Sequence, residues 1–350
     1  MIRDADARAI RAGAYELAGA ATDFDPLLDR IGDAGCVLLG EATHGTHEFY
    51  AARAHVTQRL IEEKGFHAVA VEADGPDAYR AGRWASGADD DPDAAAALGD
   101  LTRFPRWLWR NADVVRFLEW LREHNAAAAP RDSVGLYGLD LPSLHERAAL
   151  PVGPAGWNRR ERHMAQTLHA LRTQLGSDGA PGKVVVWAHN SHVGDARATE
   201  LAELNQVSLG QLSRAAYPPT DIVLVGLGTF SGTVIAASDW GGPPAIMPVA
   251  HAREDSTDAL LHATGLANLL LVMGADADAT AALQPTRLQR AIGAIYRPET
   301  ERVSHYVFAD ATRQLDALVH LDTTTALEPL DPEPGGQQLD DAQRTHPTGV

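Results

Sequence analysis

The sequence predicts an α/β fold with a mostly parallel central sheet flanked by helices, and three observations lead to this class. Four short apolar runs alternate with helical segments, a pattern typical of a parallel sheet that is covered on both faces. Each of these runs leads directly into ionisable or polar residues. After about residue 205 the pattern becomes richer in strands. We therefore expect additional β-strands in the C-terminal half, either extending the same sheet or forming an antiparallel edge.

The elements follow from hydrophobic spacing and from turn residues. The four apolar strands are expected at 36–39, 67–71, 133–137 and 183–187. Helices are expected within 5–30, at 46–63, around Tyr79 and Trp84, from about Trp107 to Asn125, and at 157–175. Six further strand candidates lie at 221–227, 233–238, 268–272, 290–296, 304–308 and 316–321. Thr46 is the first residue of the segment 46–63, and its hydroxyl is expected to cap a free helix amide.

We expect one domain over residues 1–326, with short helical cap elements near 76–125 and 141–176. Residues 327–350, which are polar and contain several Pro and Gly, are expected to form a disordered tail. The chain lacks a run of eighteen apolar residues, and an acidic, Ala-rich segment follows its first residues where a signal peptide would be apolar.

The composition limits the classes of binding partner. The net charge is −17 with 30 Lys and Arg residues, which opposes binding to nucleic acid or to an anionic membrane. The single cysteine, Cys36, lies inside an apolar run and cannot form an internal disulfide. We therefore expect a cytoplasmic location and a small-molecule partner. Nothing in the sequence predicts the oligomeric state.

Polar side chains follow all four apolar strands, and this is the strongest functional signal. Ligands of open α/β sheets bind outside the carboxyl ends of the strands, where the loops converge. A shared active site at this edge is therefore expected. Its candidate residues, in strand order, are Glu41 and His44, Glu72 and Asp74, Asp140, and His189 and His192.

Several motifs, in this order along the chain, resemble the erythromycin esterase family. They are Leu39-Gly-Glu-Ala-Thr-His-Gly45, Val71-Glu-Ala-Asp74, Arg106-Trp-Leu-Trp-Arg-Asn111, Tyr137-Gly-Leu-Asp140, Trp187-Ala-His-Asn-Ser-His192 and Ala291-Ile-Gly-Ala-Ile-Tyr-Arg-Pro-Glu-Thr300. The likeness extends from about Leu38 to about Pro329, and each motif alone is weak.

The resemblance implies hydrolysis of an ester or lactone by an activated water, without a covalent intermediate. It implies His44 as the general base, Glu41 and Glu72 in the same cleft, Arg53 as the cleft arginine and His189 as a second histidine. These roles are chemically reasonable: a carboxylate can orient the imidazole, His189 can protonate the leaving alkoxide and Arg53 can stabilise the carbonyl oxyanion. The chain has no Gly-x-Ser-x-Gly motif, which opposes a serine hydrolase.

One departure from the family concerns the substrate. Relatives have a long helical stretch after the third strand, whereas here residues 145–154 nearly close that gap, with a Pro- and Gly-rich link at 150–156. That stretch would form part of the wall or lid of the cleft. The implied catalytic class is unaffected, but a macrolide substrate becomes doubtful.

Other residues have two interpretations each. His47 is either a second cleft group or a helix residue one turn after His44. His192 either joins the site or belongs to a helix cap, and Asp140 is expected to support the site rather than react. The group Arg106, Trp107 and Arg110 either grips a substrate or packs its aromatic stripe with the arginines solvated.

A divalent metal is also compatible with the residue types, because Glu41, His44, Glu72 and His189 supply two carboxylates and two imidazoles. We favour a metal-free site, since the spacing lacks a helical His-x-x-x-His pair. The alternatives to a metal-free ester hydrolase are a metal-dependent hydrolase, a lyase or cyclase of secondary metabolism that uses the same base, and a non-catalytic binding protein.

Overall fold

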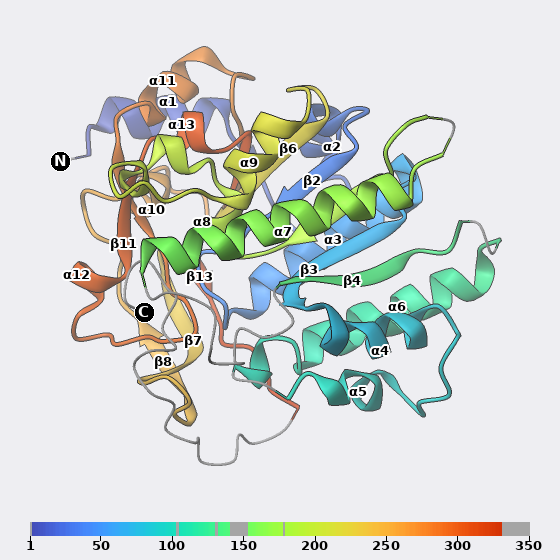
Figure 1. Ribbon diagram of the computed structural model, residues 1–350. Coiled ribbons are helices and arrows are strands. Elements are labelled where there is room, and N and C mark those ends of the chain that lie inside the picture. The colour runs from blue at the N-terminus through green and yellow to red at the C-terminus, as the bar shows by residue number, and fades with distance from the viewer. Residues whose placement is uncertain (1, 103–104, 130–131, 141–152, 178, 331–350) are drawn as a thin grey trace.

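The computed structural model describes residues 2–102, 105–129, 132–140, 153–177 and 179–330, and its centre is an eight-stranded sheet (Figure 1). All neighbouring pairs from β12 to β4 are parallel, and β9 and β1 continue the sheet with antiparallel pairing. The predicted fold class is thereby confirmed. In spatial order the strands are β1 (Tyr15–Glu16), β9 (Asn268–Val272), β12 (Ala317–Leu321), β6 (Ile222–Gly228), β2 (Cys36–Leu39), β5 (Val184–Trp187), β3 (Ala68–Asp74) and β4 (Gly135–Asp140).

Helices cover both faces of this sheet because alternate strand residues point to opposite sides. Val37, Leu39 and Val185 belong to one apolar core, and Cys36, Leu38 and Val184 belong to another. The first core is covered by α2 (Asp25–Ile31), α3 (His47–Lys64), α4 (Gly75–Ala85), α5 (Ala94–Ala97) and α6 (Ala112–Ala127). The second is covered by α1 (Asp4–Gly13), α7 (Pro154–Gln174), α8 (Asn190–Val193), α9 (Leu209–Ala216), α10 (Thr257–His262) and α11 (Ala277–Leu283).

In the C-terminal half, β6, β9 and β12 extend the central sheet, as the strand-rich pattern predicts, and two separate small sheets form as well. One has the order β13 (Thr323–Thr324), β7 (Ser231–Ala237) and β8 (Pro244–Val249), and the other pairs β10 (Arg287–Arg290) with β11 (Tyr306–Ala309). The remaining short helices are η1 (Leu98–Asp100), η2 (Arg106–Leu108), η4 (Ala196–Ala198), η5 (Glu200–Ala202), α12 (Glu301–Ser304) and α13 (Ala311–Gln314).

Two local predictions are wrong. The expected strand at 290–296 is not a strand, because the chain changes partner there: Ile292 bridges to Thr43 and Ile295 bridges to Ala237. Thr46 precedes α3 but its hydroxyl does not cap the helix. It contacts the Thr43 hydroxyl instead.

Residues 327–330 belong to the packed structure, although the tail was expected to begin at 327. Leu327 is buried, its N–H donates to the Gly45 carbonyl, and the Leu330 N–H donates to the Arg110 carbonyl. This short segment therefore joins the His44 turn to the start of α6. Residues 331–350, where the rest of the expected tail lies, are outside the described residues.

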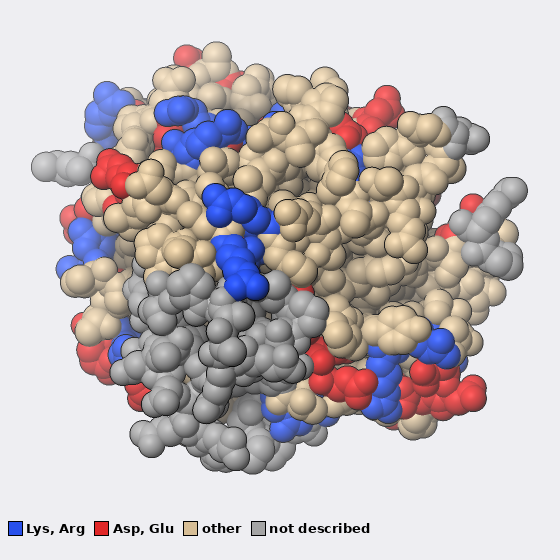
Figure 2. Space-filling view, in the orientation of Figure 1, with Lys and Arg blue, Asp and Glu red and all other residues tan. Residues whose placement is uncertain are grey.

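Opposite charges lie together on part of the visible face. Figure 2 shows acidic and basic side chains next to one another at the lower right, over α4 and α5. There Arg80 bonds both Asp91 and Asp100. Among the described helices, none is long and apolar enough to cross a membrane.

Candidate active site

The polar strand ends lie at one edge of the sheet, as the sequence predicts. Strands β2, β5, β3 and β4 are direct neighbours, and their register places Leu39 beside Trp187 and Trp187 beside Val71. The residues that follow these positions therefore emerge together. This brings the loops bearing Glu41, His189, Glu72 and Asp140 to one place.

Glu41 holds both His44 and Arg53. Its Oε1 lies 2.8 Å from His44 Nδ1, and its Oε2 lies 2.8 Å from Arg53 Nη2. All three residues are buried, His44 being the most exposed at 7%. An ionised carboxylate accepts the Nδ1–H of a neutral imidazole, which leaves Nε2 as the free proton acceptor.

Arg53 reaches Glu41 across an aromatic wall. Its guanidinium carbon lies 4.2 Å from the Tyr50 ring centroid and 5.1 Å from that of Trp187. Apart from the Glu41 ion pair, none of its nitrogens aligns an N–H with an acceptor of the described residues. A buried guanidinium therefore retains donors that a further acceptor can use.

His189 faces His44 from β5, with 4.9 Å between the two ring centroids. Its Nδ1 accepts the Ser191 N–H and lies 2.8 Å from Ser191 Oγ. That contact favours the tautomer with the proton on Nε2, which lies 3.3 Å from the Ala42 carbonyl oxygen. The backbone N–H of His189 donates to Glu72 Oε2 at 2.8 Å.

Glu72 is the centre of a second, more extensive network. Its Oε1 lies 2.7 Å from Arg160 Nη2 and 3.0 Å from His192 Nε2. Arg160 also binds both oxygens of Asp140, and His192 Nδ1 lies 2.5 Å from Glu161 Oε1. His192 is also stacked on Trp157, with ring centroids 4.6 Å apart.

These contacts shift pKa values in opposite directions. Burial opposes ionisation of Glu72, but the charges of His192 and Arg160 outweigh it and hold its pKa well below the usual range. Burial opposes protonation of His192, but Glu161 and Glu72 raise its pKa to about 9. Burial also raises the pKa of Glu161, partly offset by His192. At neutral pH, Glu72 is therefore a carboxylate beside an imidazolium.

The backbone of the His44 turn is fixed by the C-terminal half. Ile292 N–H donates to the Ala42 carbonyl, and the N–H groups of Ile235 and Leu327 both donate to the Gly45 carbonyl. A Cβ atom at position 45 would lie 1.9 Å from the Ile235 carbonyl oxygen. Only glycine fits there, so the turn places His44 through contacts that are remote in sequence.

The other predicted site residues are arranged differently. His47 Nδ1 lies 2.8 Å from both carboxylate oxygens of Asp113, and its side chain is partly exposed. Asp74 is buried at the end of β3, in register with Asp140.

The Arg106, Trp107 and Arg110 group lies in and just after η2. Trp107 is 1% exposed and packs in the first core, which favours the packing interpretation for this residue. Arg106 and Arg110 are half-buried, and Arg110 Nη1 donates to the Ala95 carbonyl.

Arg160 and Glu161 are not among the residues predicted from the sequence, although a signal for Glu161 exists. Trp157, Met164, Leu168 and Leu171 form the buried stripe of α7, and Glu161 lies on that stripe at helical spacing. A carboxylate on the apolar face of a helix requires a buried partner. The charged residues at the strand ends are the candidates for that partner.

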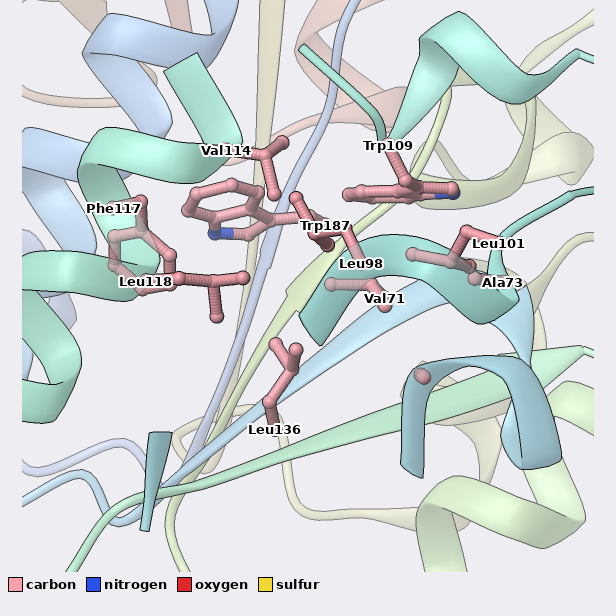
Figure 3. Close-up of a pocket in the computed structure, with 11 residues that line it drawn as sticks. Val71, Ala73, Leu98, Leu101, Trp109, Val114, Phe117, Leu118, Leu136 and Trp187 are labelled. Atoms are coloured by element: carbon pink, nitrogen blue, oxygen red, sulfur yellow. The ribbon is translucent and has the colours of Figure 1, made fainter. Parts of the chain in front are cut away.

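An apolar pocket lies beside Trp187 (Figure 3). Its lining combines strand residues such as Val71 and Leu136 with Val114, Phe117 and Leu118 of α6. Trp187 belongs to this lining and also packs under Arg53. The pocket and the charged residues therefore share one wall.

The four candidate metal ligands do not converge. Within the described ranges, no group of three or more His, Cys, Asp or Glu side chains is arranged to hold a metal ion. Glu41 is paired with His44 and Arg53, and Glu72 with Arg160, His192 and a backbone N–H. The two carboxylates thus face cationic or N–H groups.

Comparison with known proteins adds a family and a fold. The family model described as erythromycin esterase matches residues 61–152 and 147–324. Erythromycin esterase type II of Escherichia coli is 30% identical over 120 residues, which is 34% of this chain and 26% of that protein. The chain thus aligns with only about a quarter of the length of this curated relative.

Three solved structures share the fold. A succinoglycan biosynthesis protein has a TM-score of 0.76 at 17% identity and covers 92% of this chain and 97% of its own. A Bacillus cereus protein has a TM-score of 0.75 at 17% identity, covering 93% and 98%. A mutant of the erythromycin esterase EreC in its open conformation has a TM-score of 0.63 at 15% identity, covering 87% and 94%.

Proposed function

The chain belongs to the erythromycin esterase family, and we propose that it is a hydrolase that cleaves an ester or lactone with water activated by His44. The observation that supports this best is the Glu41–His44 contact of 2.8 Å at the carboxyl end of β2. A carboxylate in this position fixes the tautomer of the imidazole and stabilises its protonated form. His44 is then suited to take a proton from water near neutral pH.

The neighbouring residues supply the rest of the reaction. As His44 Nε2 takes a proton from water, the oxygen of that water attacks the carbonyl carbon. Arg53, which has donors to spare, stabilises the negative charge that develops on the carbonyl oxygen. The C–O bond then breaks, and the leaving alkoxide takes the Nε2–H proton of His189 as His189 receives the proton that His44 gained, so that no imidazolate forms. The products are an acid and an alcohol.

A lyase or cyclase using the same base is the second candidate function. The deciding measurement is the mass of the product from a panel of esters and lactones, starting with p-nitrophenyl acetate and simple lactones. Hydrolysis adds one water to the substrate mass, whereas cyclisation adds none. A product without added water, formed in a His44-dependent reaction, would refute the hydrolase proposal.

The substrate is proposed to be smaller than a macrolide. Strand β4 ends at Asp140 and α7 begins at Pro154, and the two segments that match the family model meet at residues 147–152. The expected short link itself lies largely outside the described residues. A shorter wall buries less apolar ligand surface, and remote binding energy contributes to rate. Erythromycin is therefore expected to be a poor substrate.

Incubation with erythromycin, followed by mass spectrometry of the ring-opened acid, tests this. Conversion with a kcat/KM above roughly 10⁴ M⁻¹s⁻¹, the lower end of ordinary enzymes, would show that a long segment after β4 is not needed for a macrolide substrate.

A further inference from the structure

We infer that α7 positions the Glu72 carboxylate through two consecutive residues, Arg160 and Glu161, and thereby fixes the backbone of His189, whose ring faces His44. This inference rests on the proposed function for its effect on rate. Arg160 acts on Glu72 directly, at 2.7 Å. Glu161 acts through His192, whose two ring nitrogens lie between the Glu161 and Glu72 carboxylates.

Each oxygen of Glu72 is held from a different direction. Oε1 lies between Arg160 and His192, and Oε2 accepts the His189 N–H at 2.8 Å. A carboxylate bound on both oxygens has no freedom to rotate. If Oε1 is displaced, Oε2 moves with it and shifts the His189 N–H in the loop that follows β5. The His189 ring centroid lies 4.9 Å from that of His44, so this shift also changes the position of His189 relative to His44.

His192 transmits the effect of Glu161 because of how its ring is placed. Its Nδ1 lies 2.5 Å from Glu161 Oε1 and its Nε2 lies 3.0 Å from Glu72 Oε1. Only the doubly protonated ring donates to both carboxylates, since a neutral imidazole has one N–H. The third charged group at this ring is Arg160, whose Nη1 lies 3.2 Å from Nε2 and whose charge Asp140 offsets.

Glu161 is itself fixed. It is 0% exposed, and its Oε2 accepts the Leu209 N–H at 2.7 Å. Trp157, one turn earlier on α7, stacks on His192 with an interplanar angle of 13°. One face of α7 thus supplies the ring stack, the carboxylate and the guanidinium that locate Glu72. None of these α7 residues is proposed to take part in the reaction itself.

The test uses Glu161→Gln, which keeps the shape of the side chain and removes its charge. Without the charge, His192 retains one ring proton at neutral pH, and its contact with Glu72 weakens. We expect kcat for p-nitrophenyl acetate to fall about tenfold with KM within twofold, the pattern of a displaced reacting group. The matched control is Asp195→Asn, which removes a buried carboxylate paired with Arg197 and Arg214 but without contact to Glu72.

Two NMR readouts do not depend on activity. The imidazole nitrogen signals of His192 should show two N–H groups at pH 7 in the wild type and one in Glu161→Gln. The backbone amide signal of His189 should move in Glu161→Gln and in Arg160→Lys, but not in Asp195→Asn. Arg160→Lys also provides a second variant if Glu161→Gln does not fold.

The outcomes separate the two proposals. A wild type without esterase activity, but with the expected His192 and His189 signals, would refute the proposed function and leave the positioning of Glu72 intact. A singly protonated His192 at pH 7 in the wild type, or a His189 signal that moves equally in Asp195→Asn, would refute the positioning. So would a kcat in Glu161→Gln equal to that of Asp195→Asn.

Discussion

The two sides of the site use the same residue types but differ in how fully their polar atoms are paired. The Glu72 side consists of Glu72, Asp140, Arg160, Glu161 and His192. There, Glu72 is bound on both oxygens and His192 on both nitrogens.

The His44 side consists of Glu41, His44 and Arg53. Its hydrogen bonding is incomplete. Arg53 has a close ion pair with Glu41, but its nitrogens have no aligned hydrogen-bond acceptor within the described structure. Its polar groups are held in place without being fully satisfied.

This difference suggests a division of labour. A buried network in which every member is satisfied is rigid and resists change, whereas leftover hydrogen-bonding capacity in a buried site is available to a ligand. We therefore expect chemistry on the His44 side and positioning on the Glu72 side. Residue type alone would not distinguish them, since each side contains a histidine, an arginine and at least one carboxylate.

The largest expected effect is that of His44→Ala. Removing the base should lower kcat for p-nitrophenyl acetate by at least ~10²-fold, the usual contribution of a positioned acid–base group. The fold should persist, because the turn is held by backbone contacts to Ile235, Ile292 and Leu327. Circular dichroism checks folding, and steady-state kinetics checks rate. Wild-type turnover in a folded variant would mean that His44 is not the base.

The next effect is that of Arg53→Lys. Lysine keeps the positive charge beside Glu41 but lacks the planar guanidinium that lies over Tyr50 and Trp187 and offers several donors. We expect kcat to fall between about tenfold and 10²-fold, with KM less affected, because the lost contact is to the transition state. The exposed pair Arg83 and Asp89 offers a control. Arg83→Lys should leave kcat unchanged, and equal activities for the two variants would place the oxyanion elsewhere.

The sequence could predict the His44 side because its residues lie in local motifs at strand ends. Glu41 and His44 are three residues apart, and Arg53 lies nine residues after His44 on the helix that follows the same turn. The predicted convergence of Glu72 and His189 on this edge also follows from the order of parallel strands.

The Glu72 side was only half predicted, because its other half comes from the covering helix α7. Arg160 and Glu161 lie 88 and 89 residues after Glu72, beyond the reach of any local pattern. His47 illustrates the same limit. It lies one turn after His44, yet its partner is Asp113, 66 residues away.

A smaller effect is expected in stability, and it concerns the Glu72 side. The pKa of His192 is raised from 6.5 to about 9 by Glu161 and Glu72, against the cost of burial. A raised histidine pKa stabilises the fold fully below pH 6.5, and this stability is lost as pH rises through 9. The raised pKa of Glu161 also makes the fold less stable as pH rises. From the His192 shift alone we expect a loss of at most about 3 kcal/mol between pH 6 and pH 10.

Urea unfolding at a series of pH values measures this loss. The free energy of unfolding should fall with rising pH in the wild type more steeply than in His192→Gln. His163→Gln, a half-buried position on α7, is the control and should keep the wild-type slope. Equal slopes for the wild type and His192→Gln would contradict a charged, saturated Glu72 side.

The smallest expected effect is that of a chelator on activity, which should be none. A divalent cation at Glu41, His44, Glu72 and His189 would have to replace Arg53 on one carboxylate, and Arg160 and His192 on the other. Each replacement leaves a buried cation without its partner, at a cost of several kcal/mol. We therefore expect well below one metal ion per chain by elemental analysis, and unchanged hydrolysis of p-nitrophenyl acetate after dialysis against EDTA. The contrary result is stoichiometric zinc or manganese, with activity lost on removal of the metal and restored on its addition. It would mean that the paired carboxylates rearrange around a metal. The contrast between the two sides would then describe only the metal-free protein.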